Sequence, residues 1–195
     1  FDSEFQKAMV ETTKYLIHES HAKFGYTQSD EISLVLYTDN LKSGSTIFEG
    51  RIQKIASNFA AMASVKFLTE MQLRFPHKIS DKSMPTFDAR VFVVPNKMEA
   101  YNCILWRTND ATKNSISMTA QSQFPHKALE GLSCNQMQYK LLTEKNINWN
   151  DFPSNQKQGV YIRKEKTKVK LEEDKLNKIP NDKRPEGGLV IRKKM

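Results

Sequence analysis

Two adjacent acids, Asp30 and Glu31, follow Ser29 in a short polar stretch between two segments of strand-forming residues. The flanking segments, 24–28 and 32–37, are rich in β-branched and aromatic residues and predict a β-hairpin with the acids at its tip. Carboxylates there could hold Mg²⁺, which in phosphoryl transfer keeps the phosphates and the attacking oxygen in line. A solvated turn uses the same residue types, and the spacing alone favours that simpler interpretation.

Three cations, Arg51, Lys54 and Arg90, have side chains of the kind that bind anions. Arg51 and Lys54 are three residues apart on a predicted helix and therefore lie side by side on its surface. A polyphosphate is well matched by forked guanidinium groups together with point-charge ammonium groups. The alternative is that Arg51 and Lys54 form an exposed helix face and that Arg90 pairs with Asp88 or Asp110.

A further polar group lies in the stretch 106–115, on another predicted helix. Four of its members fall within two helical turns, so some share a face: Arg107, Asp110, Lys113 and Asn114. We assign Trp106 to the core, because a helical tryptophan is more often packed inside than exposed as a stacking platform.

The elements that must position these residues are predicted from hydrophobic periodicity and turn chemistry. Apolar spacing predicts four helices, over 5–19, 47–71, 96–123 and 134–144. Besides the hairpin, strands are predicted over 87–94, 159–163 and 189–191, with a loop over 75–86 and a charged, mobile excursion over 164–184. This order predicts an α+β fold, a mostly antiparallel sheet with helices packed on one face.

The net charge of +8 is concentrated near one end of the chain. Residues 1–155 carry 17 Lys/Arg and 16 Asp/Glu, whereas residues 156–195 carry 13 and 6. Such a local field favours a polyanionic partner, nucleic acid first. A basic tail that only keeps the protein soluble is an equally good interpretation of the charge alone.

The composition excludes several other classes of protein. Its 195 residues are enough for one domain with a sizeable core, and no apolar run approaches a membrane span. No signal-peptide pattern is present at the start, so we expect a cytoplasmic protein without a membrane partner. Cys103 and Cys134 are isolated, which predicts packed free thiols in place of a zinc site or a disulfide.

Four segments, in this order, resemble the tRNA(His) guanylyltransferase-like family: GYTQSDEIS at 25–33, RIQK at 51–54, FDARVF at 87–92 and LWRTNDATKNSI at 105–116. The similarity extends over nearly the whole chain. It implies a catalytic domain similar to the palm of DNA polymerases and nucleotide cyclases, over 1–155, in which two aspartates hold two Mg²⁺ ions. The basic segment 156–195 would belong to the same domain and contact RNA.

The resemblance also assigns roles to individual residues. Asp30 matches the second metal aspartate, with Glu31 as the adjoining catalytic acid. The positions expected to contact the nucleotide are Ser29, Arg51, Lys54, Arg90 and Lys157. Those expected to contact RNA are Arg107, Asp110, Lys113, Asn114, His126 and Lys127. The implied substrates are tRNA with GTP or ATP, and the implied assembly is a homotetramer.

One departure from the eukaryotic members bears on the reaction. They carry His-Ile-Asn-Asn where this chain has Thr-Lys-Asn-Ser at 112–115, as is typical of the bacterial and archaeal branch. That branch is associated with template-dependent repair of 5′-truncated tRNA by 3′-to-5′ nucleotide addition. We therefore expect 5′-end repair, with addition of one G to tRNA(His) as the alternative.

A second departure concerns the other metal aspartate. The family carries it in an Asp-Gly-Arg motif on a strand before the first helix, and no such motif is present before Phe1. Either an N-terminal segment lies outside this sequence, which the absent initiator Met favours, or the protein is naturally shorter. In the second case we expect two-metal catalysis to fail, leaving a non-catalytic tRNA-binding protein. A nucleotide cyclase on the same fold is the other rival, and it would need no RNA.

Overall fold

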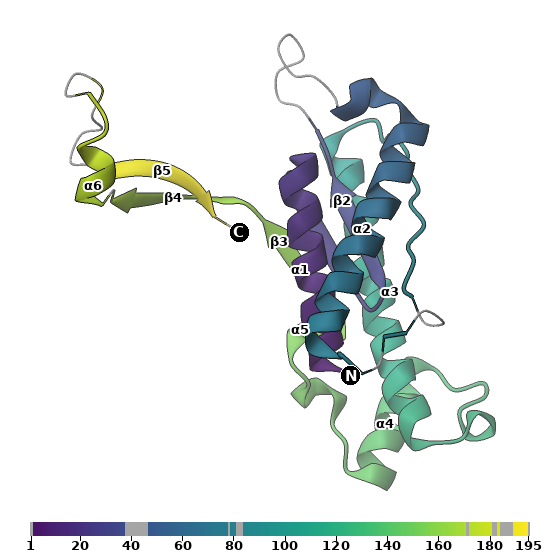
Figure 1. Cartoon of the computed structure of the whole chain (residues 1–195). Helices are drawn as coiled ribbons and strands as arrows, with labels where there is room; N and C mark the ends of the chain where they lie inside the picture. Colours follow the sequence, from purple (N-terminus) through teal and green to yellow (C-terminus); the bar gives the residue numbers. More distant parts are fainter. Residues whose placement is uncertain are drawn as a thin grey trace.

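The computed structural model describes residues 2–37, 47–77, 79–80, 84–170, 172–180, 183 and 189–194. It consists of a body of helices around a small antiparallel sheet, from which a two-stranded ribbon projects (Figure 1). The α+β class is thereby confirmed. No helix in the described ranges is long and apolar enough to cross a membrane.

The first helix, α1 (Ser3–Ser20), begins where the Asp2 side chain accepts hydrogen bonds from the backbone N–H groups of Glu4 and Phe5. It ends at His21, which has a left-handed φ of 54°. Its buried face follows the helical period and includes Ala8, Met9, Leu16 and Ile17. The predicted helix over 5–19 is confirmed.

The predicted hairpin is also confirmed. Strands β1 (Phe24–Gln28) and β2 (Glu31–Val35) are antiparallel, and β3 (Val160–Arg163) pairs with the other edge of β1. The packing of α1 on this sheet requires a glycine, because a Cβ on Gly25 would lie 2.6 Å from Cδ1 of Ile17.

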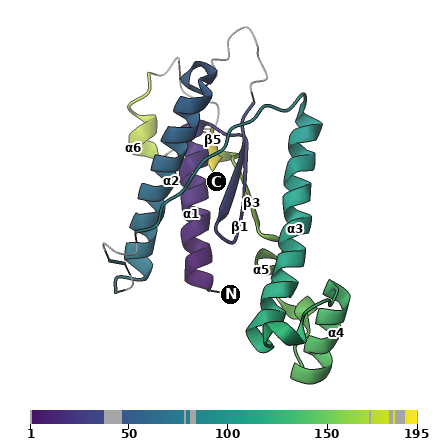
Figure 2. The ribbon, with the colours of Figure 1, turned by 90° about the vertical axis from the view of Figure 1, so that its right-hand side faces the viewer.

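Helix α2 (Ile52–Arg74) packs against α1 through Phe67, whose ring lies edge-on to those of Phe5 and Phe87. The expected start at residue 47 is wrong, because Ile47–Gly50 form a turn with left-handed backbone at Phe48 and Glu49, and the helix begins only at Ile52. Ile52, the first residue of the helix, is 50% exposed although it is apolar. The first turn of α2 extends past the end of α1, so Ile52 has no helix to pack against there (Figures 1 and 2).

The predicted strand over 87–94 is not a strand in the structure. Residues 84–91 are alternately exposed and half-buried, as in a strand, but they form no ladder with any described strand. The segment runs along α2, where the backbone N–H of Phe87 donates to Oγ of Ser64 at 2.8 Å. Alternation is a property of the local sequence, whereas a strand also needs a neighbour to pair with.

Helix α3 (Lys97–Gln123) begins at Asn96, whose side chain accepts from the backbone N–H of Glu99, as predicted. It lies on the face of the sheet opposite α1 and α2 (Figure 2). Alternate residues of β1 show this, since Gly25 meets α1 while Tyr26 lies on the α3 side. Helices therefore cover both faces of the sheet, where one covered face was expected.

The remaining elements follow α3. Helix α4 (Cys134–Lys145) begins with a capping box of Ser133 and Gln136 and matches the predicted helix over 134–144. Short turns link it to β3: the 3-10 turn Trp149–Asp151 and helix α5 (Ser154–Gln158). Cys103 and Cys134 are free, as predicted.

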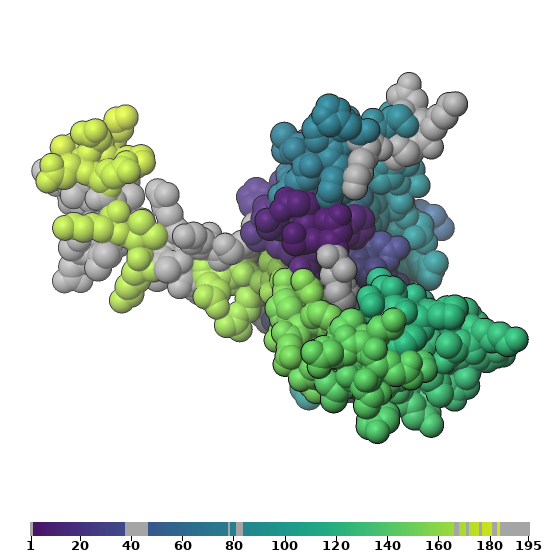
Figure 3. Space-filling model, turned by 90° about the horizontal axis from the view of Figure 1, so that it is seen from below, coloured from purple at the N-terminus to yellow at the C-terminus, as the bar shows by residue number. Residues whose placement is uncertain are grey.

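The chain then leaves the body as a ribbon of β4 (Glu165–Lys170) and β5 (Leu189–Lys194) (Figure 1). Helix α6 (Glu173–Leu176) follows β4 and lies away from the body (Figures 1 and 3). The final strand was predicted. The expected irregular excursion is wrong for β4. Thr167 and Val169 alternate there with lysines, a strand-like period of two that the high charge of the segment outweighed in the prediction.

Candidate nucleotide and metal site at the hairpin turn

Ser29 and Asp30 form a two-residue turn between the paired residues Gln28 and Glu31. Ser29 adopts a left-handed φ of 50°, the backbone that such a tight turn demands. The Thr27 hydroxyl donates to the backbone carbonyl of Glu31 at 3.0 Å and fastens the turn from inside. Asp30 is thereby presented to solvent at the tip of a well-anchored hairpin.

Helix α3 supplies the facing wall of the site. Nη1 of Arg107 lies 3.0 Å from Oε2 of Glu31, and this ion pair ties the helix to the turn. One turn further along, the Asn114 amide donates to Oδ2 of Asp110 at 3.1 Å. The predicted helical face therefore exists, and it meets the predicted hairpin tip.

The hairpin turn and α3 line an open hollow of about 320 Å³. Its lining is polar and consists of carboxylates, amides, hydroxyls and one thioether: Gln28, Ser29, Asp30, Glu31, Asp110, Asn114, Ser117, Met118 and Gln121. Six residues assigned to the site from sequence, Ser29, Asp30, Glu31, Arg107, Asp110 and Asn114, are thus brought together.

Two tyrosines, Tyr26 and Tyr161, lie between the sheet and α3 and fix the spacing between them. The Tyr161 hydroxyl is hydrogen-bonded to that of Thr108 on α3, and the Tyr26 and Tyr161 rings lie 5.0 Å apart. The Tyr26 hydroxyl donates to the Gln158 carbonyl at 2.8 Å, and burial raises the pKa of this phenol above its ordinary value. Tyr26 therefore stays neutral and serves as a structural donor.

The cations predicted to hold triphosphate do not line the hollow. Arg51 and Lys54 are at the start of α2, beside the opposite end of the hairpin from Asp30 (Figures 1 and 2). Arg51 lies 2.7 Å from the Glu49 carboxylate, and the Lys54 ammonium lies 5.2 Å from the centre of the Phe48 ring. Both side chains are exposed.

Arg90 and Lys157 have partners of their own. Arg90 lies 3.2 Å from Asp88, one of the two pairings considered for it, and both side chains are more than 80% exposed. The Lys157 ammonium donates to the Asn150 carbonyl at 2.8 Å and lies over the Trp149 ring. These contacts hold Lys157 against the 3-10 turn Trp149–Asp151.

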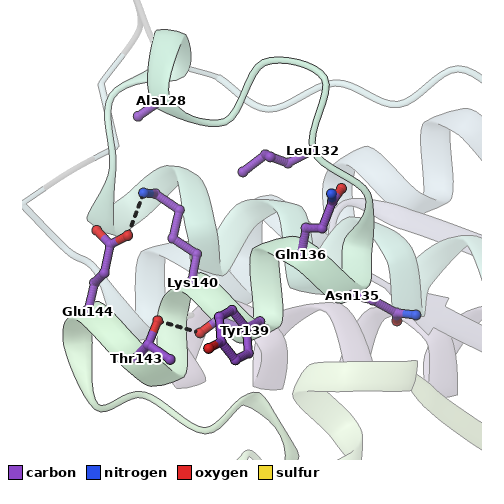
Figure 4. A pocket seen from close by; sticks show the side chains of 8 residues that line it. All are labelled: Ala128, Leu132, Asn135, Gln136, Tyr139, Lys140, Thr143 and Glu144. Carbon is purple, nitrogen blue, oxygen red and sulfur yellow. Dashed lines mark hydrogen bonds and ion pairs between the residues drawn. The ribbon is translucent and has the colours of Figure 1, made fainter.

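The other residues expected to contact RNA are separate from the hollow. Lys113 is exposed on α3, and His126 and Lys127 are exposed on the 3-10 turn His126–Ala128. That turn borders a second hollow of about 470 Å³ against α4, in which Lys140 pairs with Glu144 at 2.7 Å (Figure 4). The expectation that Trp106 is in the core is wrong, because its side chain is 61% exposed beside the Arg107 guanidinium.

The donor set of the first hollow fits a magnesium ion that shares its coordination with a substrate. The described residues contain no group of three or more His, Cys, Asp or Glu side chains that could hold a metal unaided. Magnesium is usually bound through one or two carboxylates together with phosphates and water. Asp30, with Asp110 in the same hollow, supplies ligands of that kind.

Sequence reasoning missed four residues of the lining, Gln28, Ser117, Met118 and Gln121. A signal for two of them was present. Ser117 and Gln121 continue the spacing of Asp110 and Asn114 along one helical face, so the polar stripe could have been extended by two positions.

Comparison with known proteins identifies the family. The sequence profile of tRNAHis guanylyltransferase matches residues 1–95. A solved bacterial tRNA(His) guanylyltransferase (Thg1)-like protein in complex with ATP is 48% identical, with a TM-score of 0.78 over 85% of this chain and 69% of that one. The tRNA(His) guanylyltransferase of Saccharomyces cerevisiae is 27% identical, with a TM-score of 0.73 over 84% and 75%.

A curated relative, an uncharacterized protein of Acanthamoeba polyphaga mimivirus, is 32% identical over 188 residues, which is 87% of this chain. The chain spans 64% of that protein's length. It spans 34% of the tRNA(His) guanylyltransferase of Debaryomyces hansenii, to which it is 37% identical over 95 residues. On the profile match and the bacterial structure together, this chain belongs to the tRNA(His) guanylyltransferase-like family.

Proposed function

We propose that the protein repairs the 5′ end of tRNA by template-dependent nucleotide addition in the 3′-to-5′ direction. The observation that carries this proposal is the position of Asp30, at the tip of a tied hairpin and at the edge of a polar hollow. It occurs in a chain whose relative of 48% identity was solved with ATP and another, of 40% identity, with GTP.

The proposed reaction has two phosphoryl transfers. First, an oxygen of the RNA 5′-monophosphate attacks the α-phosphorus of ATP or GTP, and pyrophosphate leaves. The 3′-hydroxyl of an incoming nucleoside triphosphate then attacks the activated 5′ phosphate, forming the new phosphodiester as the nucleoside monophosphate leaves. Because both steps gather negative charge, catalysis depends on positioning and on charge stabilisation.

The chain's own residues divide these tasks. Asp30 and Asp110 would hold the Mg²⁺, which when bound neutralises phosphate charge. Glu31 keeps the turn against α3 through Arg107, and Ser29 presents its hydroxyl at the nucleotide.

Arg51, Lys54, Arg90 and Lys157 are proposed to hold the triphosphate. Arg51 and Arg90 pair with exposed carboxylates, and exposed ion pairs contribute only about 0–1 kcal/mol. A polyphosphate can therefore replace those partners at little cost.

The RNA surface is proposed to combine two regions. The body contributes Lys113, His126 and Lys127 with Arg107, Asp110 and Asn114 of α3, and the basic segment 156–195 contributes its ribbon. An isolated two-stranded ribbon is at best marginally stable in water, so a bound polyanion would stabilise it. The strong local positive charge makes tRNA phosphate the natural partner.

We propose a homotetramer as the assembly. Supporting this, the start of α3 exposes an apolar stripe of Met98, Tyr101, Leu105 and Trp106. Aromatic residues and Met are enriched at protein interfaces, whereas Lys and Glu are depleted there. Sedimentation equilibrium tests the assembly directly, and a monomer that persists at high concentration would contradict it.

The test of function supplies the full-length gene product with 5′-monophosphorylated tRNAs that lack their first nucleotides, Mg²⁺ and the four nucleoside triphosphates. Repair predicts extension that follows the opposite strand and stops when the acceptor stem is complete. Addition of one G to intact tRNA(His), the reaction after which the yeast relatives are named, would instead favour the guanylyltransferase alternative. Soluble cyclic products without RNA would indicate a cyclase.

A non-catalytic tRNA-binding protein is the second candidate. The basic segment 156–195 supports it, because its charge suits tRNA phosphates whether or not the hollow is catalytic. Binding of truncated tRNA without any extension would establish this candidate.

A further inference from the structure

The α3 wall of the first hollow is a continuous polar stripe. Asp110, Asn114, Ser117 and Gln121 are spaced four, three and four residues apart and therefore share one face over about three helical turns. Met118 borders this stripe with its side chain about half exposed, and Gln28 faces it from β1. No role has been assigned above to Ser117, Met118, Gln121 or Gln28.

The charge of the hollow excludes a phosphate from the part of this wall beyond Asp110. Three carboxylates line it, those of Asp30, Glu31 and Asp110, and no Lys or Arg is among its described lining residues. The guanidinium nearest the turn, that of Arg107, is already paired with Glu31. The Mg²⁺ proposed at Asp30 and Asp110 would admit phosphate oxygens only beside those two acids. The ligand part against Asn114, Ser117 and Gln121 is therefore uncharged.

The functional groups present match a nucleoside. An amide both donates and accepts hydrogen bonds, as do the edges of nucleobases and the hydroxyls of ribose. The Met118 thioether offers a polarizable contact for the face of an aromatic ring. The volume, about 320 Å³, is at the lower end of the roughly 300–1,000 Å³ typical of small-molecule sites.

We propose that Gln28, Asn114, Ser117 and Gln121 bind the base and ribose of a nucleotide, with Met118 against the ring. The orientation, with the phosphates toward Asp30, rests on the proposed function. The binding itself does not. The nucleoside is supplied by an incoming triphosphate or by the terminal nucleotide of the RNA, which share this chemistry.

The test uses uncharged nucleosides without Mg²⁺, so that it is independent of catalysis. The ¹³C-methyl NMR signal of Met118 is followed during titration with adenosine, guanosine, cytidine and uridine. We expect at least one nucleoside to shift this signal, and Gln121→Ala to weaken that binding about fivefold or more, the effect of one or two lost hydrogen bonds. Gln123→Ala is the matched control, because Gln123 is exposed on the same last turns of α3 and does not line the hollow.

A second pair, Asn114→Ala with Asn109→Ala as control, covers the case in which Gln121→Ala fails to fold, which its circular dichroism would show. Titration with a nucleoside triphosphate and with 5′-hydroxyl tRNA then identifies the source by which ligand moves the Met118 signal. The inference is overturned if no nucleoside moves that signal at millimolar concentration, or if the site and control variants weaken binding equally. Nucleoside binding without RNA extension would instead overturn the proposed function alone.

Discussion

Arg107 and Glu31 are 76 residues apart in the chain, yet Nη1 of the guanidinium lies 3.0 Å from Oε2 of the carboxylate. This pair fixes the hairpin tip against α3. The pair joins an arginine expected to contact RNA to an acid expected to assist catalysis. One interaction therefore links the residues expected to contact RNA with those expected to act in catalysis. The turn that carries Asp30 is therefore positioned from both sides, by Thr27 within the hairpin and by Arg107 across the hollow.

Removing either partner of this pair is predicted to impair activity more than stability. The side chains are 38% and 53% exposed, so Arg107→Gln or Glu31→Gln should change the free energy of unfolding by less than about 1 kcal/mol. We expect each to lower kcat/KM for nucleotide addition about tenfold, because the turn loses its anchor. The double variant should lose no more than either single variant, whereas additive losses would show that the residues act separately.

Gly159 is predicted to tolerate no side chain. It has a φ of 79°, and a Cβ there would lie 2.6 Å from the Thr27 carbonyl oxygen and 2.8 Å from the Tyr26 hydroxyl. Gly159→Ala should lower the free energy of unfolding by about 2–4 kcal/mol, measured by urea denaturation, since backbone strain and a steric clash add.

Gly131→Ala is the matched control for that change. Its φ of 74° is similar, but a Cβ would meet no heavy atom within 4 Å, so the cost should be only the backbone term of about 1–2 kcal/mol. Equal effects of the two substitutions would contradict the predicted clash beneath the hollow.

Glu70 is predicted to contribute stability that depends on pH. Burial acts to raise its pKa, but hydrogen bonds from Lys66 and Arg74 outweigh burial, and the pKa is lowered. A carboxyl with a lowered folded-state pKa stabilises the protein above its unfolded pKa, about 4.3, and loses that contribution as the pH falls through the folded value.

Glu70→Gln should therefore cost roughly 1.5–3 kcal/mol at pH 7, as expected for a hydrogen-bonded charge. The difference from the wild type should shrink as the pH is lowered below about 5 in urea denaturation. Glu19→Gln, in an exposed acid at the end of α1, is the control. A Glu70→Gln difference that is constant between pH 7 and pH 3 would contradict the assignment.

Elements whose structure is decided by neighbouring residues could be predicted from the sequence. Elements whose structure depends on residues far away in the chain were harder to predict. The start of α3 at Asn96 and the Ser29–Asp30 turn could be predicted, because helix capping and tight turns involve residues that are close in sequence. The segment 87–94 has a strand's alternation, but pairing is decided elsewhere in the chain. The exposure of Trp106 depended on which face of α3 meets the sheet, which the period of a helix alone does not specify.

The site shows the same division. The acids at the turn and the polar face of α3 were each predictable from spacing, and the hollow between them follows from their meeting. Arg51 and Lys54 were grouped with Asp30 through the resemblance, whereas the fold places them at the other end of the hairpin.

The assignment of Asp30 to the metal site is tested by Asp30→Asn in the extension of a 5′-truncated, 5′-monophosphorylated tRNA, with Glu19→Gln, in an exposed acid at the end of α1, as the control. We expect Mg²⁺-dependent, template-matched extension by the wild type and the control, and a loss of at least about 10³-fold in Asp30→Asn with tRNA affinity retained. Extension by Asp30→Asn at the wild-type rate would contradict the assignment of the metal site to the hairpin turn.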